Sequence, residues 1–86
     1  MSNRVERITA ALETAYKPHA LEVIDDSHQH AGHASAGGKG HFTVRIIADA
    51  FHEQSLIQRH RMIHSTLAAL IESDIHAISI KASAPE

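Results

Sequence analysis

The sequence lacks cysteine and tryptophan, and it holds only two prolines, one tyrosine and two phenylalanines. Without cysteine the chain forms no disulfide bond, and every protein ligand to a metal ion must be a nitrogen or oxygen atom. No run of apolar residues is long enough to span a bilayer, and the N-terminal residues lack the apolar segment of a secretory signal. We therefore expect a cytoplasmic protein that does not enter a membrane.

An excess of positive charge is also missing. Eight Lys and Arg stand against ten Asp and Glu, which gives a formal charge of −2 with neutral histidines. A general polyanion binder needs a broad basic surface, so this class is excluded, whereas a local basic patch is not. The 86 residues, 43% of them hydrophobic, are typical of one globular domain with a modest core. The sequence predicts a single domain over residues 1–86.

Histidine and glycine are abundant in one stretch, from Asp25 to Phe42. This stretch holds all four glycines of the chain and four of its nine histidines. Imidazole is the commonest protein ligand for metal ions at neutral pH, and glycine gives the backbone freedom to move. Two interpretations stay open: a flexible ligand-bearing loop over residues 27–40, or a polar connection that binds metal ions only adventitiously. The four histidines are His28, His30, His33 and His41.

The spacing of apolar residues predicts a helix followed by two strands. Val5, Ile8 and Leu12 recur at three- and four-residue steps, as on an amphipathic helix, and Pro18 ends it. Asn3 and Glu6 match a capping box at its start. The β-rich runs 20–25 and 41–48 follow, and the second alternates as a strand does when it buries one face. Its buried face is predicted to comprise Phe42, Val44, Ile46 and Ala48.

A second helical region and a third strand complete the pattern. Ser55 and Gln58 match another capping box ahead of this helix, and residues 75–83 alternate as a strand. His60 falls in the middle of the apolar stripe of the helix, so we expect it to be a buried, hydrogen-bonded structural residue. The predicted stripe is Leu56, His60, Ile63, Leu67 and Leu70, and the predicted inner face of the last strand is His76, Ile78 and Ile80.

This order of elements indicates an α+β fold with helices packed on one face of a three-stranded sheet. The serines have no supporting Ser-His-Asp motif, so the chain is not expected to be an enzyme. Arg59 and Arg61, with Lys81 of the last strand, are candidates for contacts to nucleic acid or to an acidic partner.

The chain resembles the BolA family in four successive blocks: "LEVIDDSHQHAGH", "HFTVRIIADAF", "LIQRHRMIHSTLAAL" and "IHAISIKASAPE". The resemblance covers nearly the whole chain, and its most specific parts are "RHRMI" and the "IHA" that starts the final strand. It implies an α-β-β-α-α-β fold similar to a type II KH domain, with a three-stranded mixed sheet. It also implies a break in the helical region near "RHR", where a short helix would run into a longer one.

The resemblance further implies a monothiol glutaredoxin as partner and a [2Fe–2S] cluster bridged between the two proteins. The glutaredoxin would contribute its cysteine and the thiol of a bound glutathione. This chain would contribute His76 and one histidine of the loop, best placed at His30, with His28, His33 and His41 as alternatives. Two imidazoles on one iron resemble Rieske-type ligation, which raises the potential of a cluster.

Two other hypotheses remain beside cluster binding. Bacterial members of the family are linked to DNA-binding regulation of morphology and stress genes, for which Arg59, Arg61 and Lys81 are the candidate contacts. The histidine-rich loop could instead bind other metal ions, such as zinc or copper, without any partner. By itself the chain is expected to be a monomer or a weak homodimer.

Overall fold

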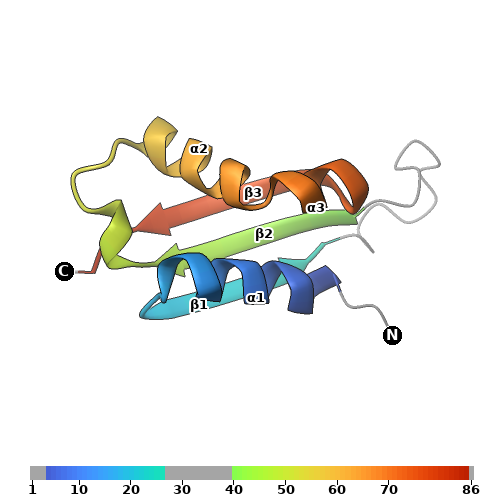
Figure 1. Ribbon diagram of the computed structural model, residues 1–86, viewed down its shortest axis with the longest axis horizontal. Helices are drawn as coiled ribbons and strands as arrows, with labels where there is room; N and C mark the ends of the chain where they lie inside the picture. Colours follow the sequence, from blue (N-terminus) through green and yellow to red (C-terminus); the bar gives the residue numbers. More distant parts are fainter. Residues whose placement is uncertain (1–3, 27–39, 86) are drawn as a thin grey trace.

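The computed structural model describes residues 4–26 and 40–85, and for His76 it describes the backbone alone. These residues form a three-stranded sheet with helices on one face (Figure 1). Strand β2 is central; it pairs with β1 in antiparallel and with β3 in parallel orientation. The α+β fold and the mixed sheet are therefore as predicted. The elements are α1 Arg4–Tyr16, β1 Ala20–Asp25, β2 Gly40–Ile47, the 3-10 helix η3 Asp49–Phe51, α2 Leu56–Thr66, α3 Ala68–Ser73 and β3 Ile75–Ser83.

The core lies between the inner face of β2 and the helices. Alternation along β2 directs one set of side chains inward, and Arg45 and Ile47 lie on the uncovered face of the sheet. Each inward side chain is at most 2% exposed, which confirms the predicted buried face. The buried apolar side chains of the core are Phe42, Val44, Ile46 and Ala48 of this strand and its extension, Ile8 and Leu12 of α1, Phe51 of η3, Ile63 and Leu67 of the α2–α3 region, and Ile75, Ile80 and Ala82 of β3.

The parallel pairing of β2 and β3 determines the path of the chain. Parallel neighbours require a crossover connection, because the chain must return to the same end of the sheet before the second strand starts. Residues 48–74 provide this crossover through η3, α2 and α3. As a result β1 ends, and β2 and β3 begin, at the same end of the sheet (at the right in Figure 1).

The helical crossover starts and breaks for identifiable reasons. The predicted capping box is present: Gln58 N–H donates to Ser55 Oγ at 3.1 Å, and Ser55 N–H donates to Gln58 Oε1 at 2.8 Å. The break between α2 and α3 lies at Leu67, later than the "RHR" segment where the resemblance placed it. Thr66 Oγ1 donates back to the Met62 carbonyl at 3.0 Å, a side-chain bond that often bends helices.

The first half of the predicted stripe on α2 is not buried. His60 is exposed and Leu56 is 68% exposed, whereas Ile63 and Leu67 are buried. The prediction that His60 is a buried structural residue is therefore wrong. Because β3 is an edge strand, no sheet lies beneath the first turns of α2, which extend past that edge in Figure 1. The periodicity indicates which side chains share a face, but it does not indicate where the sheet beneath that face ends.

Alanine substitutions at Ile63 and Leu56 compare how much the buried and the exposed half of this stripe contribute to stability. Ile63→Ala should lower the free energy of unfolding by about 2–5 kcal/mol, since it leaves a cavity in the core. Leu56→Ala removes an exposed side chain of similar size and should cost no more than about 0.5 kcal/mol. Urea unfolding followed by circular dichroism measures both. Equal losses in the two variants would contradict the burial of one half of the stripe.

Candidate metal-binding site

Three segments meet where β1 ends and where β2 and β3 begin. We call this region the histidine end of the sheet, and define it by residues 25–26, 40–41 and 75–77. The segment that connects Asp26 to Gly40 contains the predicted ligand His30 and its alternatives His28 and His33. These three residues lie outside the described residues, so their assignment stays a prediction.

Backbone and side-chain hydrogen bonds hold both points at which this segment joins the sheet. Asp26 N–H donates to the His41 carbonyl at 2.7 Å, and Thr43 Oγ1 donates to Asp26 Oδ2 at 2.5 Å. On the other side, Gly40 N–H donates to the Asp74 carbonyl at 2.9 Å. The histidine-bearing segment therefore leaves and re-enters the sheet at anchored positions beside the start of β3.

His76 occupies an irregular position at the start of β3. Gly40 pairs with Ile75 and His41 pairs with Ala77, so His76 is an extra residue between two regular pairs of the parallel ladder. Such a bulge is rare between parallel strands and often lies next to a functional site, where it changes the direction of a side chain. Ile75 is buried together with Ile80, although strict alternation would place them on opposite faces. The predicted shared face of His76, Ile78 and Ile80 assumed strict alternation, and the side chain of His76 is outside the described part.

His41, the remaining alternative ligand, is a described residue of β2. It is half-buried and alternates with the inward Phe42, so it belongs to the uncovered face of the sheet with Thr43. Its partner across the ladder is Ala77, the residue after His76. Tertiary structure thus places the backbones of His41 and His76 next to each other. Within the described residues no group of three or more His, Asp or Glu side chains is arranged to hold a metal ion.

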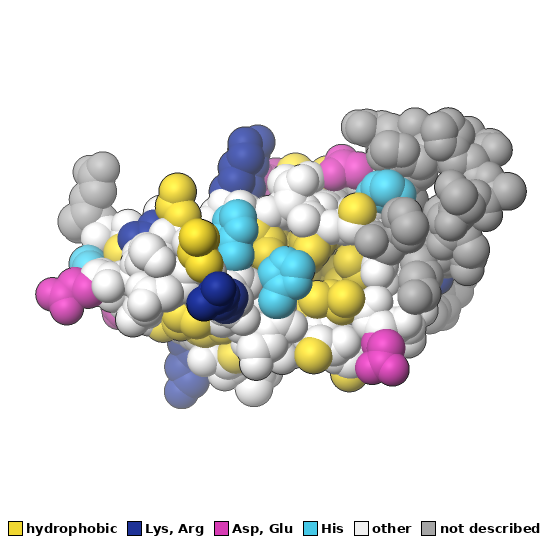
Figure 2. Space-filling view, turned by 90° about the horizontal axis from the view of Figure 1, so that it is seen from above, with side chains coloured by type: hydrophobic (Ala, Val, Ile, Leu, Met, Phe, Trp, Pro, Cys, Tyr) yellow, Lys and Arg dark blue, Asp and Glu magenta, His cyan; other side chains and the backbone are white. Residues whose placement is uncertain are grey.

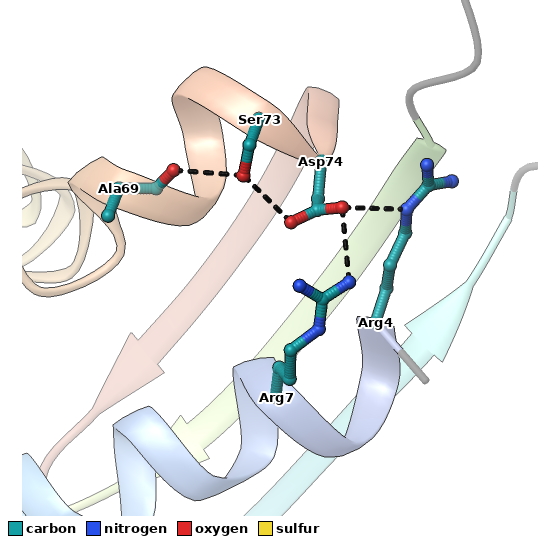
Figure 3. Close-up of polar contacts among 5 residues, drawn as sticks. All are labelled: Arg4, Arg7, Ala69, Ser73 and Asp74. Atoms are coloured by element: carbon teal, nitrogen blue, oxygen red, sulfur yellow. Dashed lines mark hydrogen bonds and ion pairs between the residues drawn. The ribbon is translucent and has the colours of Figure 1, made fainter. Parts of the chain in front are cut away.

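An acidic residue immediately precedes β3 and links it to α1. Asp74 Oδ1 accepts from Arg4 Nε at 3.2 Å and from Arg7 Nη2 at 3.1 Å, while Oδ2 accepts from Ser73 Oγ at 2.8 Å (Figure 3). Glu6 in the first turn of α1 has the sign that the helix dipole favours, whereas Arg4 and Arg7 at that end and Asp74 after the last turn of α3 have the sign that it disfavours. Pairing them offsets both unfavourable interactions and holds the start of β3 against α1.

The same contacts stabilise the ionised form of Asp74. The Ser73 hydroxyl lowers the pKa of this carboxyl most, burial acts in the opposite direction, and the guanidinium groups of Arg4 and Arg7 lower it further. The pKa in the folded protein is thus below the ordinary value of about 3.9. A depressed carboxyl pKa stabilises the fold above the ordinary value, and this contribution is lost as the pH falls through the folded-state pKa.

Asp74→Asn should therefore lower the thermal midpoint near pH 7, and the difference from the unsubstituted chain should shrink as the pH falls below about 4. Thermal unfolding from pH 7 to pH 2.5 measures this difference. Glu72→Gln is the matched control, because Glu72 is exposed on α3 and no ion pair is recorded for it among the described residues. A loss in Asp74→Asn that is the same at every pH would contradict the role of its charge.

The comparisons with known proteins agree with this architecture. The family model described as BolA-like protein matches residues 12–86. The chain belongs to the BolA family. It is 40% identical over 75 residues to the DNA-binding transcriptional regulator BolA of Escherichia coli. The matched region covers 87% of this chain and 70% of that protein. It is also similar to the solved BolA domain of SufE1 from Arabidopsis thaliana, with TM-score 0.87, 45% identity, and coverage of 99% of this chain and 95% of that one.

Some BolA-family relatives are much longer than this chain. The chain is 46% identical over 91 residues to SufE-like protein 1, chloroplastic/mitochondrial, of Arabidopsis thaliana. The matched region covers 99% of this chain but only 24% of that protein. The chain is also similar to the solved structure of BolA1 from Arabidopsis thaliana, with TM-score 0.85 and 34% identity. That match covers 99% of this chain and 95% of the other. Among the described helices none has the length and apolar character needed to cross a bilayer. The cytoplasmic compartment stays a prediction.

The three basic residues predicted to contact a partner do not share one surface of this BolA-family protein. Arg59 donates from Nε to the Gln54 carbonyl and from Nη1 to the Ala82 carbonyl, both at 2.9 Å. Arg61 is exposed on the outer face of α2. Lys81 is exposed and alternates with the buried Ile80 and Ala82, so it belongs to the uncovered face of the sheet, opposite the helices.

The contacts of Arg59 have a structural consequence that the sequence does not indicate. Ala48 N–H donates to the Ser83 carbonyl at 3.0 Å, so the backbone groups of Ser83 are directed toward the neighbouring strand. Successive strand residues direct these groups to opposite edges, and the Ala82 carbonyl is therefore on the free edge of β3. Arg59 satisfies this carbonyl and ties the start of α2 to the edge strand.

Arg59 and Arg61 should accordingly differ in their effect on stability. Arg59→Ala removes two charge-assisted hydrogen bonds to carbonyl groups and should lower the free energy of unfolding by about 1–3 kcal/mol. Arg61→Ala should change it by no more than about 0.5 kcal/mol, since that side chain is exposed. Chemical unfolding of the two variants measures this. If Arg59→Ala unfolds at the same denaturant concentration as Arg61→Ala, its role at the strand edge is wrong.

Proposed function

We propose that this BolA-family protein binds a [2Fe–2S] cluster at the histidine end of its sheet, together with a monothiol glutaredoxin that supplies thiolate ligands. The observation that supports the proposal most is the parallel pairing that puts the backbone of His76 beside Gly40 and His41. The segment with His28, His30 and His33 joins the sheet at that same Gly40. Residues far apart in sequence thus meet beside the end of a segment that carries three histidines.

The available donor atoms fit half of such a cluster. The chain has nine histidines and no cysteine, so it offers imidazole nitrogens but no thiolate. Iron–sulfur clusters with mixed ligation carry two imidazoles on one iron and two thiolates on the other. This chain would hold one iron through His76 and His30, and the cysteine and glutathione thiols of the glutaredoxin would hold the second. A cluster bound in this way supplies one-electron chemistry, or is passed on as cargo.

The two proposed ligands differ in whether another histidine can replace them. The backbone of His76 lies between the paired residues Ile75 and Ala77, so this position requires little reorganisation before ligation. His30 has His28 and His33 as near neighbours in sequence, and these can substitute for it. We therefore assign His76 as the ligand that cannot be replaced and His30 as the preferred member of an interchangeable set. Other metal ions that favour imidazole would compete for the same set.

DNA-binding regulation is the second candidate function, because the similar Escherichia coli BolA is a DNA-binding transcriptional regulator. Electrostatics favour it less. Acidic residues outnumber basic ones, Arg59 is engaged with two carbonyl groups, and Arg61 and Lys81 belong to different layers. DNA affinity depends on basic side chains that reach phosphates together. We therefore place cluster binding first.

Reconstitution with a monothiol glutaredoxin, iron, sulfide and glutathione tests the proposal. Absorbance and circular dichroism should show a mixed-complex spectrum that differs from that of the glutaredoxin alone. His76→Ala should abolish this spectrum, and His30→Ala should weaken it only in part. The triple variant His28→Ala/His30→Ala/His33→Ala should abolish it again. His52→Ala, at an exposed histidine outside the histidine end, is the matched control.

A native spectrum in His76→Ala would contradict the proposed site. Size-exclusion chromatography of the same variants shows whether the two proteins still associate, which separates loss of a ligand from loss of docking. DNA titration of the unsubstituted chain at increasing salt then addresses the second function. If DNA binds tightly and its affinity falls steeply with salt, while no mixed cluster forms, the order of the two functions is reversed.

A further inference from the structure

The outer face of α2 holds a hollow that neither the cluster proposal nor the core explains. Four side chains line it, from Ile57, His60, Arg61 and His64, around a volume of about 420 Å³. In Figure 2 this face shows histidine side chains beside hydrophobic and basic ones. Ile57 is 63% exposed, and His60, Arg61 and His64 are exposed as well. The face is thus open to ions and ligands in solvent.

His60 and His64 are placed alike on this helix. They are separated by four residues within α2, so their side chains lie one above the other on the same face. Both line the same hollow, which agrees with this geometry. Neither imidazole forms a hydrogen bond or ion pair with another described residue, so an ion that binds there displaces no contact within the described part of the chain.

We propose that His60 and His64 form a two-imidazole site for a divalent transition metal ion on the outer face of α2. Imidazole nitrogens favour Zn²⁺, Ni²⁺ and Cu²⁺, and a pair at this spacing on one helix can chelate a single ion. The helix is regular from Leu56 to Thr66, and the Ser55–Gln58 capping box holds its start. A site on a rigid helix requires little reorganisation of its ligands.

Arg61 limits what the site binds but does not block it. It follows His60 directly in sequence and precedes His64 by three residues, so it flanks the imidazole pair and lines the same hollow. The guanidinium is exposed, so solvent and salt screen its repulsion of a cation. Its fixed charge also favours an ion that carries an anionic ligand from solution, which would fill the open coordination positions.

The number of ligands determines the kind of site. Structural zinc sites are closed by four protein ligands, whereas two imidazoles leave at least two positions for water or an exogenous ligand. The ion is therefore exchangeable. The site is also separate from the histidine end, because it uses only residues of α2 and requires neither a partner protein nor residues 27–39.

Zinc titration of the full chain, followed by NMR of the imidazole nitrogens, tests the proposal at individual residues. The signals of His60 and His64 should shift together with one dissociation constant. His52, an exposed imidazole without a helical neighbour of this kind, provides the single-imidazole reference. Zinc should bind the pair roughly tenfold or more tightly than it binds His52. Once one imidazole holds the ion, the second is on the same helix and binds it at a high effective concentration.

A relocation variant supplies the matched control. His64→Gln/Ser65→His keeps the number of histidines in the chain but moves one imidazole away from the face of His60, since position 65 is exposed on another side of α2. Zinc affinity at His60 should fall to that of His52. The proposal is overturned if His60 and His64 titrate independently, if neither shifts, or if the relocation variant binds as tightly. Circular dichroism of each variant confirms that α2 is retained.

Discussion

The parallel pairing of β2 with β3 is the constraint on which the rest of this structure depends. Parallel strands begin at the same end of a sheet, so the chain must cross back over the core between them. The crossover through η3, α2 and α3, together with α1, covers one face of the sheet and leaves the other face uncovered. The same pairing brings the start of β3, with His76, beside Gly40 and the end of the histidine-bearing segment.

β3 is an edge strand, and contacts from outside the sheet hold it near both of its ends. Asp74 does this at its start through Arg4 and Arg7 of α1, and Arg59 does so near its end through the Ala82 carbonyl. The two contacts act at opposite ends of the strand. The backbone around the bulge at His76 therefore lies next to an anchored point, as a ligand position requires.

The two proposed metal sites differ in what completes them. At the histidine end the chain offers nitrogen ligands only, so an iron–sulfur cluster there depends on thiolates from another protein. On α2 the two imidazoles belong to one helix, and solvent or a small anion completes the coordination. The first site links the protein to a partner, whereas the second is available to the isolated chain. Both follow from a composition that combines many histidines with no cysteine.

Local pattern determined the elements of this protein. The strand limits at 20–25 and 75–83, the buried face of β2 and the Ser55–Gln58 capping box were all predictable, because alternation, periodicity and capping depend on neighbours in sequence. The BolA resemblance added the topology. The candidate ligand His76 was assigned through the same resemblance, and spacing alone did not single it out.

Tertiary structure alone decided what those elements cover and where the ladder is irregular. His60 is exposed because the edge of the sheet ends beneath α2, and periodicity carries no information about that edge. The bulge at His76 depends on how two strands pair across a crossover, which no local pattern records. Asp74 meets Arg4 and Arg7 across a long sequence separation, so their ion pairs could not be read from spacing. Interactions between neighbours in sequence determined the helices and strands, whereas tertiary packing determined which of their surfaces are exposed and meet at the proposed sites.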